Sequence, residues 1–333
     1  MTLRYRQMRP NDVGRCVDIL AVHPVNRPRY GSAISELGKT WLRLLGSEAF
    51  TAVVFEELHG DKFDFLGAGV SVFVSDAFLR EIKTPPFFWI GPEIVRRISR
   101  GDSPVLSDRQ LREANTRGEL NLIGWHAVTS VENARRVEVL NFVFGSFIEL
   151  HRGFFIKELI GQADSPMGVE GIANSGGGFF DAALGRFVDS LPACPEQIVN
   201  TLHVMGETRE MAFAKPWLLG TSLFSYQRPV FAFRRSEQRL LAAALQGGTD
   251  EDLAKELGVS LSFVRRTWLS IYDRVGACLP EFFAEDPNEN GRSGRGKRKK
   301  YRLLAYVRDH PQELRPLSRK LLLTGGMAAG IDG

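Results

Sequence analysis

Two adjacent arginines near the carboxyl end of the chain, Arg265 and Arg266, are the side chains best suited to binding a polyanion. Each guanidinium presents N–H donors in a planar fork, which matches a phosphate group or the O6 and N7 atoms of guanine. Apolar residues recur every three or four positions around them and predict a helix with one buried side. These apolar residues are Val264, Trp268, Ile271 and Val275. The arginines then fall on the opposite side, with Ser262, Leu269 and Asp273.

Two shorter helices are predicted ahead of this one, within residues 233–277. The first ends at Gln246-Gly247-Gly248, since glycine readily closes a helix. The second begins at Thr249, whose hydroxyl can accept a free backbone N–H while Asp252 returns the contact. The turn Gly258-Val259-Ser260 then caps the third helix with its serine. The core-facing residues of the first two helices are Leu240, Leu241, Ala244, Leu245, Leu253, Ala254 and Leu257.

This three-helix run resembles the LuxR-type helix-turn-helix family of bacterial transcription regulators. The family pattern can be laid along all 45 positions of residues 233–277 without a gap, with its first-helix glutamate on Glu237 and its Leu-Gly-Ile-Ser on residues 257–260. Three positions depart from it: Phe263 replaces a threonine, Thr267 a frequent histidine and Trp268 a leucine. The resemblance implies a DNA-binding domain over residues 228–285, with its third helix in the major groove.

Basic charge is concentrated at the same end of the chain. Between Arg228 and Lys320 there are 19 Lys and Arg residues against 12 Asp and Glu, whereas the remaining residues have 24 against 27. A confined basic excess is the electrostatic footprint of a nucleic-acid-binding surface. It favours DNA over the alternative of a helical module that docks another polypeptide.

The segments after the module are expected to add phosphate contacts. Residues 286–300 are polar and glycine-rich and end in four cations, which predicts either a flexible basic linker that adds salt-sensitive affinity or a solubilising loop. Residues 301–333 are expected to contain a helix over 301–309 that packs on the module or on a second copy. The expected groove-facing residues are Ser262, Arg265, Arg266 and Leu269. The expected phosphate contacts are Thr249, Lys255, Ser260, Lys297, Arg298, Lys299 and Lys300.

Residues 1–227 are predicted to form a mixed α/β domain. Strands are expected over residues 3–8, 50–55, 63–74, 119–129 and 154–160, with the third broken by Gly67 and Gly69. Helices are expected over residues 11–20, 35–45, 93–98, 107–115, 132–150 and 168–173.

The order of these elements resembles the GNAT acyltransferase fold over most of residues 1–227, and Arg9-Pro10-Asn11-Asp12 is similar to that family's first strand-to-helix turn. We therefore expect an α+β chain: a GNAT-like mixed sheet flanked by helices, followed by an all-α LuxR-type helix-turn-helix domain. In the GNAT family, amides of a glycine-containing turn after the central strand cradle the acyl-CoA pyrophosphate. Residues 129–134 stand there without glycine and with an added Glu132, so no cofactor and no catalytic residue is assigned.

Several other features have structural explanations. Residues 176–178 are three glycines without a following Lys-Ser/Thr, so they are expected to form a turn rather than a phosphate loop. His126 lies on an alternating strand and is expected to be a packed or surface residue rather than a general base. The tryptophans Trp41, Trp89, Trp125 and Trp217 are expected in the core rather than around a ligand pocket.

Composition limits the class of protein. A chain of 333 residues with 44% hydrophobic content can bury two cores. The sequence has neither an eighteen-residue apolar run nor a signal-peptide core at its start, which predicts a cytoplasmic location and no membrane contact. Cys16, Cys194 and Cys278 are expected to be buried reduced thiols, and the six histidines show no metal-ligand spacing.

These observations favour a transcription regulator that binds double-stranded DNA, acts as a homodimer on its site, and senses a ligand or partner of unknown identity through residues 1–227. The alternative is a GNAT-type N-acetyltransferase that uses acetyl-CoA and recruits its substrate through the carboxyl-terminal module. The two classes differ in whether acetyl-CoA binds.

Overall fold

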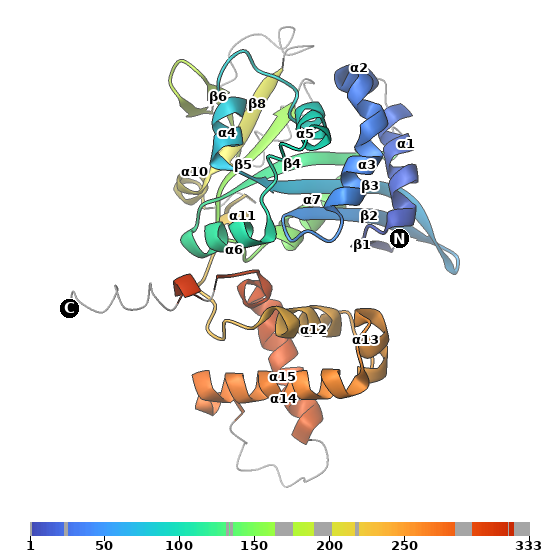
Figure 1. Ribbon diagram of the computed structural model, residues 1–333, viewed down its shortest axis with the longest axis vertical. Helices are drawn as coiled ribbons and strands as arrows, with labels where there is room; N and C mark the ends of the chain where they lie inside the picture. Colours follow the sequence, from blue (N-terminus) through green and yellow to red (C-terminus); the bar gives the residue numbers. More distant parts are fainter. Residues whose placement is uncertain are drawn as a thin grey trace, which may run out of the picture. The chain divides into compact units, whose positions relative to one another are not determined.

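The computed structural model describes residues 2–22, 26–130, 133, 136–163, 176–189, 202–216, 220–283, 295–318 and 320–322. The chain divides into two compact units (Figure 1). Unit 1 comprises Met1–His151 and Phe155–Phe224, and unit 2 comprises Arg152–Phe154 and Ser225–Gly333. The expected α+β class is confirmed at that level, because unit 1 contains an eight-stranded mixed sheet with flanking helices and unit 2 is helical.

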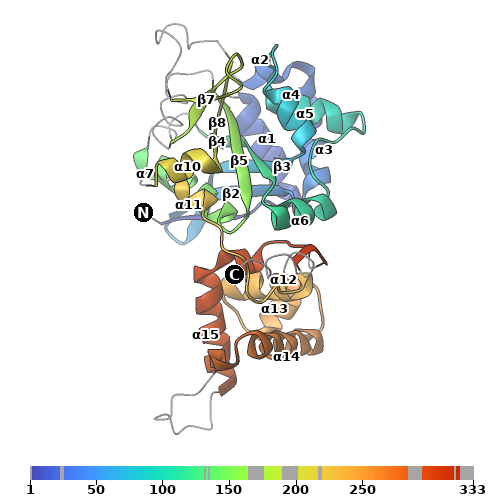
Figure 2. The ribbon, with the colours of Figure 1, turned by 90° about the vertical axis from the view of Figure 1, so that its left-hand side faces the viewer.

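Unit 1 is built on one sheet with the strand order β1-β2-β3-β4-β5-β8-β6-β7. All neighbouring strands pair antiparallel except β4 and β5, which are parallel and are connected through α7. The strands are β1 (Leu3–Gln7), β2 (Phe50–His59), β3 (Lys62–Val74), β4 (Leu120–Thr129), β5 (Ile156–Ala163), β6 (Gly178–Asp181), β7 (Arg186–Val188) and β8 (His203–Thr208). Figure 2 shows this sheet from a second direction.

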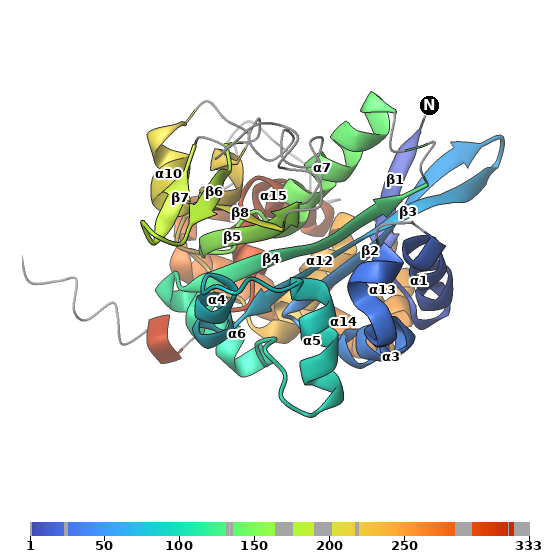
Figure 3. The same ribbon diagram turned by 90° about the horizontal axis from the view of Figure 1, so that it is seen from above.

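Helices cover both faces of the sheet. Seen from above, α1 (Val13–Val22), α3 (Ile34–Leu44) and α5 (Ile90–Ser99) lie on one face, and α7 (Val137–His151) lies on the other (Figure 3). The other helices in the described part of unit 1 are α2 (Asn26–Tyr30), α4 (Asp76–Ile82), α6 (Asp108–Arg117), α10 (Arg209–Ala214) and α11 (Thr221–Phe224), with short 3-10 helices η1 (Pro10–Asp12) and η2 (Gly31–Ala33).

The expected break at Gly67 and Gly69 is wrong, because β3 runs through both residues as one strand. A Cβ on Gly67 would come within 2.2 Å of the Val128 carbonyl oxygen, and one on Gly69 would come within 2.9 Å of the Phe55 ring. The glycines therefore allow close packing inside the sheet rather than ending the strand. The pairing of β3 has two register shifts, one against β2 opposite Phe55 and Glu56 and one against β4 between Val70 and Ser71.

Other element boundaries also differ from expectation. Helix α7 begins at Val137 and not at Glu132, which lies outside the described residues. The expected short helix over 168–173 lies outside them as well, as do Cys194 and Trp217. The helices α2, α4, α10 and α11 were not predicted, and the strands β6 to β8 were expected only as further strands without positions, since elements this short have little periodicity to detect.

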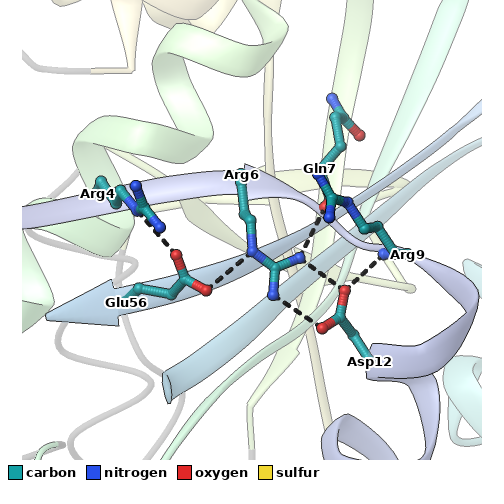
Figure 4. Close-up of polar contacts among 6 residues, drawn as sticks. All are labelled: Arg4, Arg6, Gln7, Arg9, Asp12 and Glu56. Carbon is teal, nitrogen blue, oxygen red and sulfur yellow. Dashed lines mark hydrogen bonds and ion pairs between the residues drawn. The ribbon is translucent and has the colours of Figure 1, made fainter. Parts of the chain in front are cut away.

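The first strand-to-helix turn is held by charge (Figure 4). The Arg6 guanidinium donates to both carboxylate oxygens of Asp12, at 2.7 and 2.8 Å, and also to Glu56 at 2.8 Å. Asp12 accepts a third hydrogen bond, 2.7 Å long, from the backbone N–H of Arg9. The hydrogen bond from Arg6 is the main cause of the lowered pKa of Asp12. Asp12 therefore joins β1 to η1 and α1.

Replacing Asp12 with alanine is expected to lower the free energy of unfolding of unit 1 by about 1–2 kcal/mol, because the change removes a helix cap and one side of a paired charge. Urea denaturation followed by circular dichroism measures this loss. Asp18→Ala is the matched control, since Asp18 is exposed on α1. An equal effect in the two variants would contradict the structural role given to Asp12.

Candidate nucleic-acid interface

The helix α12 (Arg235–Leu245) supplies four buried residues to the core of unit 2, namely Leu240, Leu241, Ala243 and Ala244. Leu240, Leu241 and Ala244 are buried as expected, and Leu245 packs against them partly buried. The helix ends before Gly247 and Gly248, both at a φ of 98°. Unit 2 also contains the helices α13 (Asp250–Leu257), α14 (Leu261–Cys278) and α15 (Arg295–Asp309), with 3-10 turns η4 (Pro280–Phe283) and η5 (Pro311–Leu314).

The start of α13 is capped as the sequence predicts. The Thr249 hydroxyl accepts from the Asp252 backbone N–H at 3.2 Å, and the Asp252 carboxylate accepts from the Thr249 backbone N–H at 2.9 Å. The helix ends at Gly258, whose φ of 66° is a left-handed conformation that favours glycine. Ser260 then caps α14 by accepting from the Phe263 backbone N–H at 3.2 Å. These local signals fix the end of α13 and the start of α14.

The two faces of α14 have opposite character, which confirms the predicted partition. The apolar stripe is buried: Val264, Trp268, Ile271 and Val275. The opposite face is exposed: Ser262, Arg265, Arg266, Leu269 and Asp273. Leu269 leaves 61% of its surface open, although it is apolar. The structure therefore places all four expected groove-facing residues together on one outer surface.

The expected phosphate contacts at the starts of α13 and α14 are also exposed. Thr249, Lys255 and Ser260 all lie at the surface of unit 2. The hydroxyls of Thr249 and Ser260 already serve as helix caps, and Thr249 also donates to Asp252 at 2.8 Å. The polar side chains of Thr249 and Ser260 are thus explained by helix capping. Lys255 takes no part in these capping hydrogen bonds.

Glu237 connects α12 to α14 through its carboxylate, and only 1% of the surface of this residue is exposed. It accepts from the Arg234 backbone N–H at 2.6 Å, from the Ser270 hydroxyl at 2.8 Å and from the Arg274 guanidinium at 2.9 Å. Burial by itself raises the pKa of Glu237, but these hydrogen bonds outweigh it and the pKa is lowered. The family glutamate matched in the sequence therefore has a structural role that periodicity alone does not reveal.

The expected flexible linker up to residue 300 is wrong in its last part, because α15 begins at Arg295 rather than Tyr301. Of the four cations, Lys297 has a side chain outside the described residues, while Arg298 and Lys299 are exposed on the helix. Lys300 forms a 3.1 Å ion pair with Asp250 and lies over the Trp268 ring. Tertiary contacts thus stabilise a helix where glycine and charge suggested a loop.

The carboxyl-terminal part of α15 completes the core, in agreement with the expectation that it packs on the module. Leu303 and Val307 are fully buried against α12 and α14 residues. Within η5, the buried carboxylate of Glu313 accepts hydrogen bonds from the backbone N–H groups of Val230 and Phe231, at 2.6 and 3.1 Å. Burial raises the pKa of Glu313 despite these bonds. Sequence reasoning missed Glu313, since its partners lie more than eighty positions away.

His126 of unit 1 lies in an aromatic cluster with Tyr30, Trp41 and Trp125. His126 shares a 2.5 Å hydrogen bond with the Tyr30 hydroxyl, which also accepts from Trp125 at 2.9 Å. Burial lowers the pKa of His126 to about 3. The ring is therefore neutral and packed at pH 7, as expected. Trp41 and Trp125 are buried. Of the turn expected at the acyl-CoA pyrophosphate, Val131, Glu132 and Ala134 lie outside the described residues.

Cysteines and metal-binding groups can be placed only in part. Cys16 is buried and Cys278 is exposed, so the expectation of burial is wrong for Cys278, which ends α14 beyond its buried stripe. Within the described ranges, no cluster of His, Cys, Asp and Glu side chains could hold a metal ion. In those same ranges no helix combines the length and apolar character needed to cross a bilayer.

Comparison of the chain with protein-family models, curated proteins and solved structures found no match.

Proposed function

We propose that unit 2 is the DNA-binding module of a transcription regulator and that α14 reads duplex DNA in the major groove. One observation carries the proposal: the face of α14 opposite its fully buried stripe presents Arg265 and Arg266 to solvent, with Ser262 and Leu269 beside them. An α-helix fits the major groove, and arginine is the side chain most often used there to recognise guanine.

The surrounding geometry supports a helix-turn-helix rather than an isolated basic helix. The cap at Thr249, the left-handed Gly258 and the cap at Ser260 set α13 across the start of α14. In modules of this kind the first helix of the pair crosses the DNA backbone while the second enters the groove. We therefore assign Lys255 and the exposed cap residues Thr249 and Ser260 to phosphate contacts, which position the module without reading sequence.

A second copy of the chain is part of this proposal. One module of this size buries limited surface on DNA, so useful specificity requires two copies on paired half-sites. We assign unit 1 to the sensing of a ligand or partner protein.

The experiment is a binding titration of the full chain with duplex DNA. Fragments retained from a random duplex library are sequenced, and affinity for the enriched duplex and for a scrambled one is measured by fluorescence anisotropy over a range of salt concentrations. We expect enrichment of a sequence and an affinity that falls steeply with salt, because phosphate contacts release counterions. Absence of binding to every duplex at low salt would overturn the proposal. A salt-independent interaction would favour docking of another polypeptide.

The acetyltransferase alternative has one observation in its favour. The pairing of β4 with β5 ends at Ile123 and Ile160, although β4 continues to Thr129 and β5 to Ala163. The two parallel strands therefore separate, and their facing edges do not pair with each other beyond that point. The GNAT resemblance implies that acetyl-CoA binds beside the central strand. Under this alternative acetyl-CoA raises the melting temperature, since a ligand that binds the folded state stabilises it; an unchanged melting temperature at millimolar acetyl-CoA removes it.

A further inference from the structure

Three cations in the first turns of α15 lie over aromatic rings of unit 2. The Lys299 Nζ is 5.2 Å from the centre of the Phe283 ring, the Lys300 Nζ is 4.9 Å from that of Trp268, and the Arg302 guanidinium is 5.5 Å from that of Phe282. Contacts of this kind attract a cation to the face of the ring. The basic residues are therefore held against the module and do not form a free arm.

Asp250 reinforces this attachment. Its Oδ1 atom accepts from the Trp268 indole N–H at 3.2 Å and lies 3.1 Å from the Lys300 Nζ. One carboxylate at the start of α13 thus joins the side of α14 to α15. The indole is also the reason for the departure at Trp268: a leucine there would give neither a ring face for Lys300 nor a donor for Asp250.

The rings themselves form a continuous path between the helices. The Trp268 ring stacks on the Tyr272 ring with their centroids 5.9 Å apart, and the Tyr272 ring meets the Phe283 ring edge-on with a centroid distance of 5.7 Å. The centroid of the Phe282 ring lies 4.9 Å from that of Phe283 and 5.4 Å from that of Tyr306 on α15. With Leu303 and Val307 fully buried beneath them, α15 is part of the folded core of unit 2.

This attachment places the basic turn beside the outer face of α14. Trp268 lies one helical turn after Arg265, so Lys300 packs along the edge of α14 that adjoins the exposed arginine. The views in Figures 1 and 2 agree that α15 crosses α14 and that its amino-terminal end extends beyond it. Arg298 and Lys299 are exposed there, and Tyr301 leaves 75% of its surface open.

We propose that the first two turns of α15 form a rigid phosphate clamp, in which Arg298 and Lys299 contact the DNA backbone beside the groove occupied by α14. Trp268, Asp250, Phe283 and Lys300 are positioning residues for this clamp. The inference rests on the proposed function of α14. A docked helix loses less conformational entropy on binding than a flexible arm with the same charges, so it adds affinity at lower cost. It adds no base recognition, because phosphates are the same at every sequence.

The test compares two double-charge variants of the full chain on the enriched and the scrambled duplex. In Arg298→Gln/Lys299→Gln we expect the slope of log affinity against log salt to become less steep by about 1.8, which is roughly 0.9 for each lost phosphate contact. Affinity for both duplexes then falls by about tenfold or more near physiological salt, and their ratio stays unchanged. The control is Arg239→Gln/Arg308→Gln, which removes the same charge from exposed positions on α12 and near the carboxyl end of α15.

A second variant tests the positioning role without changing charge. Phe283→Leu removes the ring under Lys299 at a partly buried position outside the three helices of the predicted helix-turn-helix. We expect a weaker affinity for both duplexes with an unchanged ratio between the two affinities, and circular dichroism verifies that the variant is folded at the assay temperature. Trp268→Leu should act in the same direction with a larger effect.

Wild-type salt dependence in Arg298→Gln/Lys299→Gln, in a chain whose binding still requires Arg265 and Arg266, would overturn the clamp and leave the proposed function intact. A fall in the ratio of the affinity for the enriched duplex to that for the scrambled duplex would also overturn the clamp, because it would assign base recognition to α15. Failure of the unaltered chain to bind any duplex would instead reject the proposed function together with the clamp.

Discussion

Replacing Arg265 and Arg266 together with alanine is expected to abolish sequence-specific DNA binding while unit 2 stays folded. Both side chains are exposed on α14, so their removal leaves the core of Val264, Trp268 and Ile271 untouched. A well-placed arginine on a base edge contributes about 1–3 kcal/mol of discrimination. Loss of two such contacts therefore reduces affinity for the enriched duplex by about 3 kcal/mol or more, which is roughly 100-fold. Anisotropy titration against enriched and scrambled duplexes measures both affinities.

The control for this variant is Arg239→Ala/Arg308→Ala, which removes the same charge from exposed residues of α12 and α15. It should weaken binding to both duplexes slightly and equally, since charge at a distance acts without regard to sequence. Equal affinities of the Arg265→Ala/Arg266→Ala variant and the wild type for the enriched duplex would show that α14 is not the reading helix. Thermal melting of both variants verifies that the fold is retained.

Replacing Glu237 with alanine is expected to lower the free energy of unfolding of unit 2 by about 3 kcal/mol, because one partner of a buried ion pair is removed and the other is left without compensation. The side chain of Arg274 is only 15% exposed, and Ser270 and the Arg234 backbone N–H lose their acceptor as well. Urea denaturation followed by circular dichroism measures the change. Glu256→Ala, at an exposed position of α13, is the control and should change stability by less than about 0.5 kcal/mol.

The same carboxylate makes stability depend on pH. The pKa of Glu237 in the folded chain is below its ordinary value of 4.5, so its contribution is fully present above that value and is lost as pH falls through the folded pKa. Glu313 acts in the opposite sense, because its pKa is raised in the folded chain. Stability therefore falls as pH rises from the ordinary pKa of a glutamate to the raised pKa of Glu313. Comparing the free energy of unfolding of the wild type with that of Glu237→Gln between about pH 6 and pH 3 isolates the contribution of Glu237. The stability difference between them should shrink toward low pH, and a constant difference would exclude the assigned ion pair.

Sequence reasoning succeeded where the signals are local. The caps at Thr249 and Ser260, the turn at Gly258 and the buried stripe of α14 depend on residues within a few positions of one another. Each of these features restricts backbone conformation by itself, through a hydrogen bond, a left-handed φ or a periodic apolar side. The exposed face that carries Arg265 and Arg266 follows from the same period.

Sequence reasoning failed where a distant partner decides the outcome. Arg295 to Lys300 read as a linker, yet Asp250 and the Trp268 ring hold this segment in a helix. Gly67 and Gly69 read as strand breaks, yet the Val128 carbonyl and the Phe55 ring require their small size. In each case the partners lie on a different helix or strand, too far apart along the chain for a local pattern to encode the contact.

The order of residues alone therefore determined the helices α12 to α14, their caps and the division of α14 into a buried and an exposed side, since helix periodicity and capping act over one or two turns. Tertiary structure alone decided that α15 starts at Arg295, that Glu237 binds α14 and that Glu313 closes the unit. Those contacts form only after folding brings remote segments together, because burial of a charge is favourable only when its partners already surround it.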